Sequence, residues 1–280
     1  MSKENFDRKV VVRFLNTEYE DFRIHATVRK DLNGEPNEAD ITVYGLSRRT
    51  EAAALEAQQN TIIQLEAGYD GTSELIFEGQ PIPGGVTVER DGEDKTLKIE
   101  AADGRQGYQE TQITLSAGEV RSYQQTLEEI TRFAAAQNPH FADSPVEIQP
   151  DIPNGHKRLP RGMVWDGNLR DVADTIAEDL DCDWSFQNGT FIFLHKDAFR
   201  PVRGPLFSAD NGNLINAPAP QDNGIEITGL LTACDPGQRY RVQSRLNPRY
   251  NGDYKAIKTR YELDSGYDGP FYVQVEGRPT

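Results

Sequence analysis

The chain has 280 residues, of which 30 are Lys or Arg and 45 are Asp or Glu, so its formal net charge at pH 7 is −15. Such an acidic surface repels nucleic-acid phosphates and anionic lipid, so we expect no specific nucleic-acid binding and no attachment to a membrane surface. A chain of this length buries a substantial core and most often divides into two or three domains.

The N-terminus, the apolar runs and the cysteines narrow the class further. The N-terminus is polar and turns directly into a strand pattern, so we predict no secretion signal. No run approaches the ~18 apolar residues of a membrane-spanning helix, so we expect no membrane span. Cys182 and Cys234 lie far apart in sequence and form neither a disulfide framework nor a metal-ligand pair. These features predict folding in the cytoplasm of the producing cell.

Short strand patterns fill the first part of the chain, residues 1–112. Residues 22–29 alternate between apolar and polar side chains, which is the period of a half-buried strand. Asn33-Gly34 predicts a hairpin turn, because both residues tolerate positive φ. An Ala- and Glu-rich stretch predicts one short helix over residues 50–58. Further strands are expected at residues 9–15, 41–44, 62–67, 74–78, 85–89 and 96–102. This pattern favours a closed or nearly closed antiparallel barrel.

The middle of the chain predicts a small α+β domain over residues 113–205. Ser122 and Gln125 have capping-box spacing at the start of an amphipathic helix that should end near Asn138. A Pro-rich link, residues 145–160, then leads to Trp165.

A helix and a hairpin complete this middle domain. Residues 169–180 carry one apolar stripe and predict a second amphipathic helix. The strands 182–187 and 190–195 follow directly, and Asn188-Gly189 between them predicts a type I′ turn.

Strand patterns return in the last part, residues 206–280. A Gly-, Asn- and Pro-rich linker or surface loop over residues 207–221 comes first. Strands are then expected at residues 225–231, 239–244, 253–263 and 270–275.

This last part echoes the first. ITVYGL at residues 41–46 is matched by IEITGL at 225–230, and GYDG at 68–71 is matched by GYDG at 266–269. Each GYDG is followed by Glu-Gly at an offset of 10 residues from its first Gly, at Glu78-Gly79 and Glu276-Gly277. The echo indicates a duplicated module. The expected fold is therefore mainly β with an α+β insertion, in which two similar barrel-like modules flank a small helix–hairpin domain.

No constellation of catalytic residues is visible in the sequence. The four histidines, His25, His140, His156 and His195, have no metal-ligand spacing and no neighbouring Cys. Asp179, Asp181 and Asp183 alternate where a helix passes into a strand, a pattern typical of solvated charges. Trp165 and Trp184 are expected to be core side chains. We therefore predict no catalytic, cofactor-binding or metal-binding residues, no cofactor and no enzyme activity.

Three passages, in order, resemble one known family. They are LIFEGQPI (75–82), LRDVADTIAEDLDCDWSFQNGTFIFL (169–194) and NGDYKAIKTRYELDSGYDGPFYVQVEGRP (251–279). They resemble the opening barrel, the helix–hairpin domain and the closing barrel of the tail baseplate hub proteins of long-tailed bacteriophages. The resemblance covers nearly the whole chain. The N-terminal part of type VI secretion spike proteins shares this architecture.

The resemblance implies a structural hub. It implies a homotrimeric adaptor that joins the sixfold tail tube to the threefold central spike and leaves a channel for DNA. The implied partners are a tail tube protein or distal tail protein, the central spike protein and the tape measure protein. The implied location is the tail baseplate of the virion, after folding and assembly in the host cytoplasm. An acidic channel lining would let DNA slide past without sticking.

Two alternatives stay open at this point. Another tail ring component, such as a distal tail or tube-terminating protein, would form a sixfold ring and would not need a duplicated module. A surface carbohydrate-binding or hydrolytic β protein would need exposed aromatic residues in a cleft, or a carboxylate pair on facing strands. Neither feature is visible in the sequence.

Overall fold

The computed structural model describes residues 7–15, 17–47, 51–52, 54, 61–69, 71–91, 94–104, 111–117, 121–137, 145–159 and 162–280. The chain is mainly β, as predicted, and its described part holds two α-helices of several turns, α3 (Tyr123–Gln137) and α5 (Leu169–Leu180). Of the helix predicted over residues 50–58, Glu51, Ala52 and Ala54 are helical, and the other positions lie outside the described residues.

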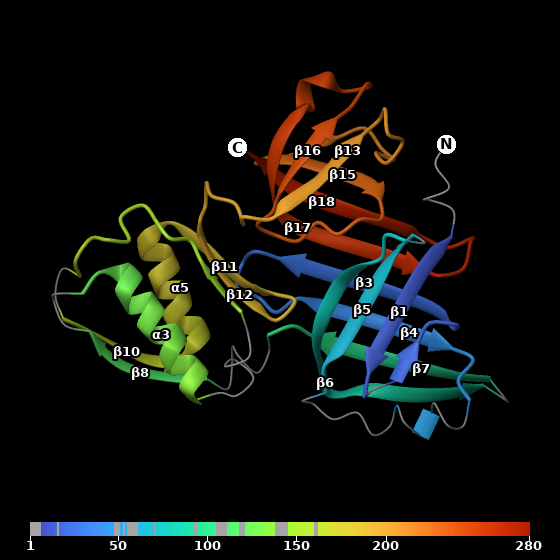
Figure 1. Cartoon of the computed structure of the whole chain (residues 1–280), viewed down its shortest axis with the longest axis horizontal. Helices are drawn as coiled ribbons and strands as arrows, with labels where there is room; N and C mark the ends of the chain where they lie inside the picture. Colours follow the sequence, from blue (N-terminus) through green and yellow to red (C-terminus); the bar gives the residue numbers. More distant parts are fainter. Residues whose placement is uncertain are drawn as a thin grey trace.

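Most strands belong to one 13-stranded sheet (Figure 1). Its main path runs β14-β15-β18-β17-β3-β4-β7-β6-β5-β1-β2, while β16 pairs with β17 and carries β13. The strands of the first half are β1 (Arg8–Phe14), β2 (Thr17–Tyr19), β3 (Arg23–Asp31), β4 (Glu38–Tyr44), β5 (Ile63–Tyr69), β6 (Glu74–Asp91) and β7 (Asp94–Ala102). The strands of the second half are β13 (Arg203–Ser208), β14 (Ala219–Gln221), β15 (Gly224–Leu230), β16 (Arg239–Gln243), β17 (Gly252–Asp264) and β18 (Phe271–Pro279).

The two halves are joined by antiparallel pairing of β3 with β17, from Asp31 opposite Lys258 to His25 opposite Asp264. The predicted pair of separate barrels is therefore replaced by one continuous sheet, and the strand pairs of the described residues close no barrel. The physical reason is that β3, an edge of the first half, finds its partner in the second half. Both halves share one hydrophobic core.

The sheet wraps around this core because β6 bends. The first part of β6 pairs with β5 and its last part pairs with β7, with a register shift between Pro81 and Val86. Gly84, inside the shift, has φ +73°, a conformation that side-chain-bearing residues rarely adopt. The bend carries β5, β1 and β2 across the core to face β3, β4 and β7 (Figure 1).

The middle segment folds into a separate helix–hairpin unit beside the sheet (Figure 1). Helices α3 and α5 contact a two-stranded antiparallel sheet of β8 (Gln112–Ala117) and β10 (Met163–Asn168). A three-stranded sheet combines β9 (Val146–Ile148), β11 (Cys182–Gln187) and β12 (Thr190–His195). This unit has its own hydrophobic core. The predicted Pro-rich link thus contributes a short strand, β9, parallel to β12.

Local predictions in this unit are confirmed. The Ser122 hydroxyl accepts a hydrogen bond from the Gln125 amide at 3.2 Å, and the Gln125 side chain accepts one from the Ser122 amide at 3.1 Å. This is the reciprocal capping box. Asn188 and Gly189 have φ of 51° and 75°, as a type I′ turn requires. The predicted helix end at Asn138 lies outside the described residues.

The two GYDG motifs both lie where a strand turns back on itself. The first connects β5 to β6, and the second connects β17 to β18. The pairing differs in detail, because Glu78 lies opposite Gln64 whereas Glu276 lies opposite Lys258, twice as far from the motif. The duplication therefore stays a prediction.

Buried polar contacts fix the hairpin of the helix–hairpin unit to the sheet. The Lys30 ammonium, with a fully buried side chain, donates to Asn188 and to Asp235, each at 2.7 Å. The Asn37 amide donates to the Phe186 carbonyl at 2.7 Å. The contacts with Asn188 and Phe186 join the hairpin tip to the sheet and its loops, and the Lys30–Asp235 pair joins the two halves of the sheet. We call these contacts, with those of Lys255 and Asp103 below, the junction.

A second buried cation lies at the other end of the junction. The Lys255 ammonium donates to Asp183 at 3.0 Å and to the carbonyls of His195 and Lys196. Burial lowers the pKa of Lys255, and the nearby Asp183 carboxylate opposes that shift. Since a buried charge without a partner costs several kcal/mol, these pairs require the hairpin to stay seated.

Asp103 gives the junction a pH dependence. Its carboxylate accepts a hydrogen bond from the Gly189 amide at 3.1 Å, and burial raises its pKa from 3.8 to about 6. The folded state thus holds the Asp103 proton more tightly than the unfolded state. Stability from this group is full below the unfolded pKa and is lost as pH rises through the folded pKa, by about 3 kcal/mol as an order of magnitude.

We therefore expect Asp103→Asn to flatten the pH profile. Urea unfolding should show wild type losing about 2–3 kcal/mol relative to this variant between about pH 4 and pH 7. Glu100→Gln, which alters an exposed carboxylate of the sheet, is the control and should follow wild type. Parallel profiles for Asp103→Asn and wild type would contradict the prediction.

Gly277 makes room for Tyr240 between two strand layers. A Cβ at Gly277 would overlap the buried Tyr240 hydroxyl and ring edge. We expect Gly277→Ala to lower the free energy of unfolding by about 1–3 kcal/mol, as overpacking does. The Tyr240 hydroxyl has no hydrogen-bond partner among the described residues. Combining Tyr240→Phe with Gly277→Ala removes this hydroxyl from the path of the new Cβ, so the double variant should recover part of the lost free energy of unfolding. Chemical denaturation of the two single variants and the double variant measures this; independent, additive effects would contradict it.

Candidate functional site

The histidines do not form a site. His25 lies on β3, His195 ends β12, and His156 is exposed 3.5 Å from Asp151. His140 lies outside the described residues. In the part of the chain that the structure describes, no group of three His, Cys, Asp or Glu side chains could hold a metal ion.

The alternating aspartates of residues 179–183 do not act together, because those described next have different partners. Asp181 ends α5 in the left-handed conformation, with φ 52°, and pairs with Lys196. Asp183 accepts from the buried Lys255, so the interpretation of this residue as a solvated charge is wrong. The sequence pattern could not show this, because the cation that pairs with Asp183 comes from β17, in the second half of the sheet. Nothing here resembles a carboxylate pair for acid–base chemistry.

The aromatic and thiol candidates are core residues. Trp165 and Trp184 are buried in the core of the helix–hairpin unit, as predicted. Cys182 and Cys234 are free and buried, and burial raises the pKa of the Cys182 thiol to about 12. A thiol of this kind is not a nucleophile at neutral pH.

An extended polar face spans both halves of the sheet. It covers seven neighbouring strands, β15, β18, β17, β3, β4, β7 and β6. Residues opposite each other in antiparallel strands point to the same side, so the register defines the face row by row. One such row is Leu230, Tyr272, Glu262, Thr27, Asp40 and Glu100. The alternate residues, such as Val28 and Ile41, point into the core.

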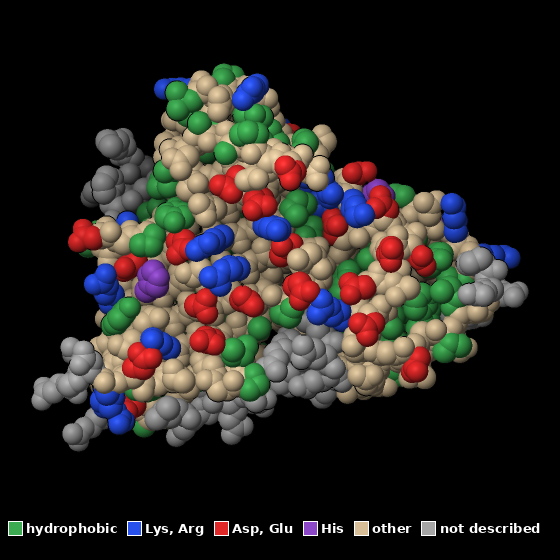
Figure 2. All heavy atoms as spheres, turned by 180° about the vertical axis from the view of Figure 1, so that it is seen from behind, with side chains coloured by type: hydrophobic (Ala, Val, Ile, Leu, Met, Phe, Trp, Pro, Cys, Tyr) green, Lys and Arg blue, Asp and Glu red, His purple; other side chains and the backbone are tan. Residues whose placement is uncertain are grey.

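Charges of both signs are interspersed on the polar face, as Figure 2 shows across the middle of the molecule. Its carboxylates are Asp31, Glu38, Asp40, Glu89, Glu100, Glu226, Glu262, Asp264 and Glu276, and its cations are Arg23, Arg29, Lys98, Lys258 and Arg260. Neighbours pair, for example Arg29 with Asp40 at 3.1 Å and Lys98 with Glu89 at 2.7 Å. The face is therefore acidic overall and holds no continuous basic track.

A shallow cleft marks the place where the polar face meets the helix–hairpin unit. It has a volume of ≈ 650 Å³, within the range of roughly 300–1,000 Å³ that is usual for small-molecule pockets. Its walls carry Arg29, Asp31, Lys258 and Glu276, together with the loop after β3. The mixture of opposite charges gives it no preference for one ionic ligand.

No helix in the described ranges is both long and apolar enough to span a membrane.

Comparison with known proteins identifies the family. The family model described as Baseplate hub gp41 matches residues 8–277. No curated protein matches the sequence.

Solved structures share the fold at low sequence identity. The prophage MuSo2 43 kDa tail protein from Shewanella oneidensis is similar at 8% identity, with a TM-score of 0.64 and 98% of each chain covered. The tail protein from Neisseria meningitidis MC58 is similar at 11% identity, with a TM-score of 0.66 over 98% of this chain and 97% of that chain. The Escherichia coli c3393 protein, a component of the type VI secretion system, is similar at 8% identity, with a TM-score of 0.60 over 96% and 76%.

At such identities these likenesses show the fold alone, whereas the family match spans nearly the whole chain. The protein belongs to the Baseplate hub gp41 family and is a non-enzymatic structural component of a phage tail baseplate.

Proposed function

We propose that three copies of the chain form a closed ring that joins the sixfold tail tube to the threefold central spike, with the polar faces around a channel for DNA. The observation that carries the proposal is the continuity of the polar face across both halves through the β3–β17 ladder. If the halves are duplicated modules, with domains at residues 1–112, 113–205 and 206–280, three copies offer six similar wall segments. Such a ring mates with sixfold and threefold neighbours.

The width of the polar face supports a channel of suitable size. Strands lie about 4.8 Å apart, so seven strands span ~34 Å and three copies span a circumference of ~100 Å. A circle of this circumference is ~32 Å across between backbones, and strand tilt widens it further. After side chains are allowed for, a DNA duplex passes. The acidic surplus and paired charges of the face give phosphates no sustained attraction.

The proposed partners follow from this position. One end of the ring contacts a tail tube or distal tail protein, and the other contacts the central spike. The tape measure protein occupies the channel before DNA passes. A chain of the Francisella PdpA–VgrG complex is similar at a TM-score of 0.56 and 10% identity, which supports a spike as partner. The place of action is the baseplate of the virion, after assembly in the host cytoplasm.

The mass of the protein in solution tests the ring. We expect light scattering across a concentration series, alone and with the purified spike protein, to give the mass of three 31.4 kDa chains. A hexamer would favour the alternative of a distal tail or tube-terminating ring. A monomer under both conditions would contradict the trimeric adaptor.

The charge of the polar face gives a second prediction. Wild type should not retard a short DNA duplex at low salt, whereas Glu38→Lys, Asp40→Lys and Glu100→Lys together should bind it with a steep salt dependence. The matched control, Asp151→Lys with Glu178→Lys and Asp197→Lys, places three exposed lysines on the helix–hairpin unit. If the control retards DNA as strongly as the polar-face variant, the position of the charges is irrelevant and the proposed channel face is wrong.

A further inference from the structure

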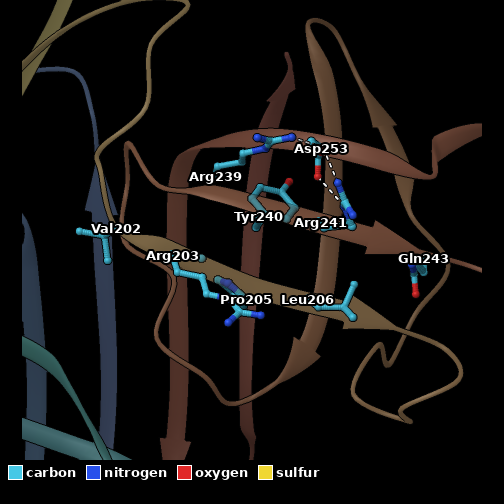
Figure 3. Close-up of a pocket in the computed structure, with 10 residues that line it drawn as sticks. Val202, Arg203, Pro205, Leu206, Arg239, Tyr240, Arg241, Gln243 and Asp253 are labelled. Carbon is cyan, nitrogen blue, oxygen red and sulfur yellow. Dashed lines mark hydrogen bonds and ion pairs between the residues drawn. The ribbon is translucent and has the colours of Figure 1, made fainter. Parts of the chain in front are cut away.

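A groove on the second half of the sheet has a character opposite to that of the polar face. It lies over β13, β16 and the start of β17 and has a volume of ≈ 410 Å³ (Figure 3). Its lining includes Val202, Arg203, Leu206, Arg239, Arg241 and Asp253. It thus gathers three arginines against one carboxylate on a chain whose net charge is −15.

Two aromatic contacts show which way the groove faces. Phe207 of β13 packs where a Cβ at Gly229 of β15 would stand, and Tyr240 of β16 does the same at Gly277 of β18. The layer of β13 and β16 therefore packs through its inner side onto β15 and β18. The outer side of this layer, which carries the groove, points away from the polar face.

The arginines differ in how far they are already paired. Arg241 makes a two-pronged contact with Asp253, at 2.7 and 2.8 Å, and Arg239 contacts the same carboxylate. These contacts hold the pKa of Asp253 well below its ordinary value. The Arg203 guanidinium makes no hydrogen bond or ion pair with the described residues, and only its backbone pairs with β16. The groove therefore presents one free guanidinium beside two that a single carboxylate holds in place.

The apolar part of the groove lies next to the free arginine. Val202 and Leu206 are 42% and 37% exposed, large fractions for branched side chains on or beside a strand. Gly204 between them lets β13 approach the Arg239 carbonyl, because a Cβ there would overlap that oxygen. The groove thus presents an unpaired guanidinium close to exposed apolar side chains.

The edge of β13 is closed to an added strand. Pro205 has no amide hydrogen, and Asn213 covers the edge by accepting from the Ser208 amide and donating to the Leu206 carbonyl, each at 2.7 Å. A partner therefore binds through side chains in the groove and not by extending the sheet.

We propose that this groove docks an acidic peptide segment of a second tail protein, with a carboxylate on Arg203 and separate apolar side chains on Val202 and on Leu206. The occupant is not another copy of this chain, because copies in the proposed ring meet at the ends of the sheet while the groove points to the outside. The outward orientation of the groove rests on the proposed function. The charge and shape of the groove are independent of that proposal.

A labelled synthetic peptide that alternates Glu and Leu probes the site. Fluorescence polarisation with the full chain should give saturable binding of one peptide per chain, and Arg203→Glu should weaken it about tenfold or more. Arg260→Glu, an equal change on the polar face, should leave the affinity unchanged. A peptide that alternates Lys and Leu should not bind.

The outcomes separate the inference from the proposed function. Absence of saturable binding, or equal weakening by Arg203→Glu and Arg260→Glu, overturns the docking site even if the protein is a trimer. Binding that is lost on trimer formation overturns the outward orientation and the second protein as occupant. Site-dependent binding to a chain that is never trimeric leaves the groove standing and rejects the ring.

Discussion

The ladder between β3 and β17 is the contact on which the rest of the architecture depends. It pairs residues from opposite ends of the chain, and its register decides which side chains face the core. A slip of β17 by one residue against β3 would turn Leu263 outward and bring Arg260 and Glu262 into the core. The cost of burying those charges holds the register. Because β3 is committed to β17, neither half closes on itself, and one face runs across both.

The junction adds the third part of the molecule to this frame. Lys30 and Lys255 come from strands of the sheet, while Asn188 and Asp183 come from the hairpin of the helix–hairpin unit. Such buried pairs contribute little net stability, since desolvation offsets the attraction, but separating them leaves a bare charge in the interior. The contacts therefore act on orientation more than on stability. A rigid orientation suits the proposed role of an adaptor between two fixed symmetries.

Predictions that depend on neighbours in sequence agree with the structure, and those that depend on distant partners do not. The capping box at Ser122 and the turn at Asn188 are set by their own residues, so the pattern was sufficient. The β3–β17 ladder, the burial of Asp183 and the bend at Gly84 each require a partner far along the chain. Alternation in β3 predicts a half-buried strand, but it does not say which strand completes the face. The polar face therefore could not be predicted from the sequence.

The distribution of charged and polar side chains suits a protein that works through extended contact surfaces. Its buried ionisable groups, such as Lys30 and Asp103, are consumed in holding the junction together. Its exposed charges are spread over a wide sheet and largely neutralise one another, which suits sliding contact and not tight binding of one ligand. The groove at Arg203 concentrates one sign of charge beside apolar side chains. Since Phe207 and Tyr240 hold that layer against the back of the polar face, the same packing separates the face proposed to line a DNA channel from the groove proposed to bind a partner.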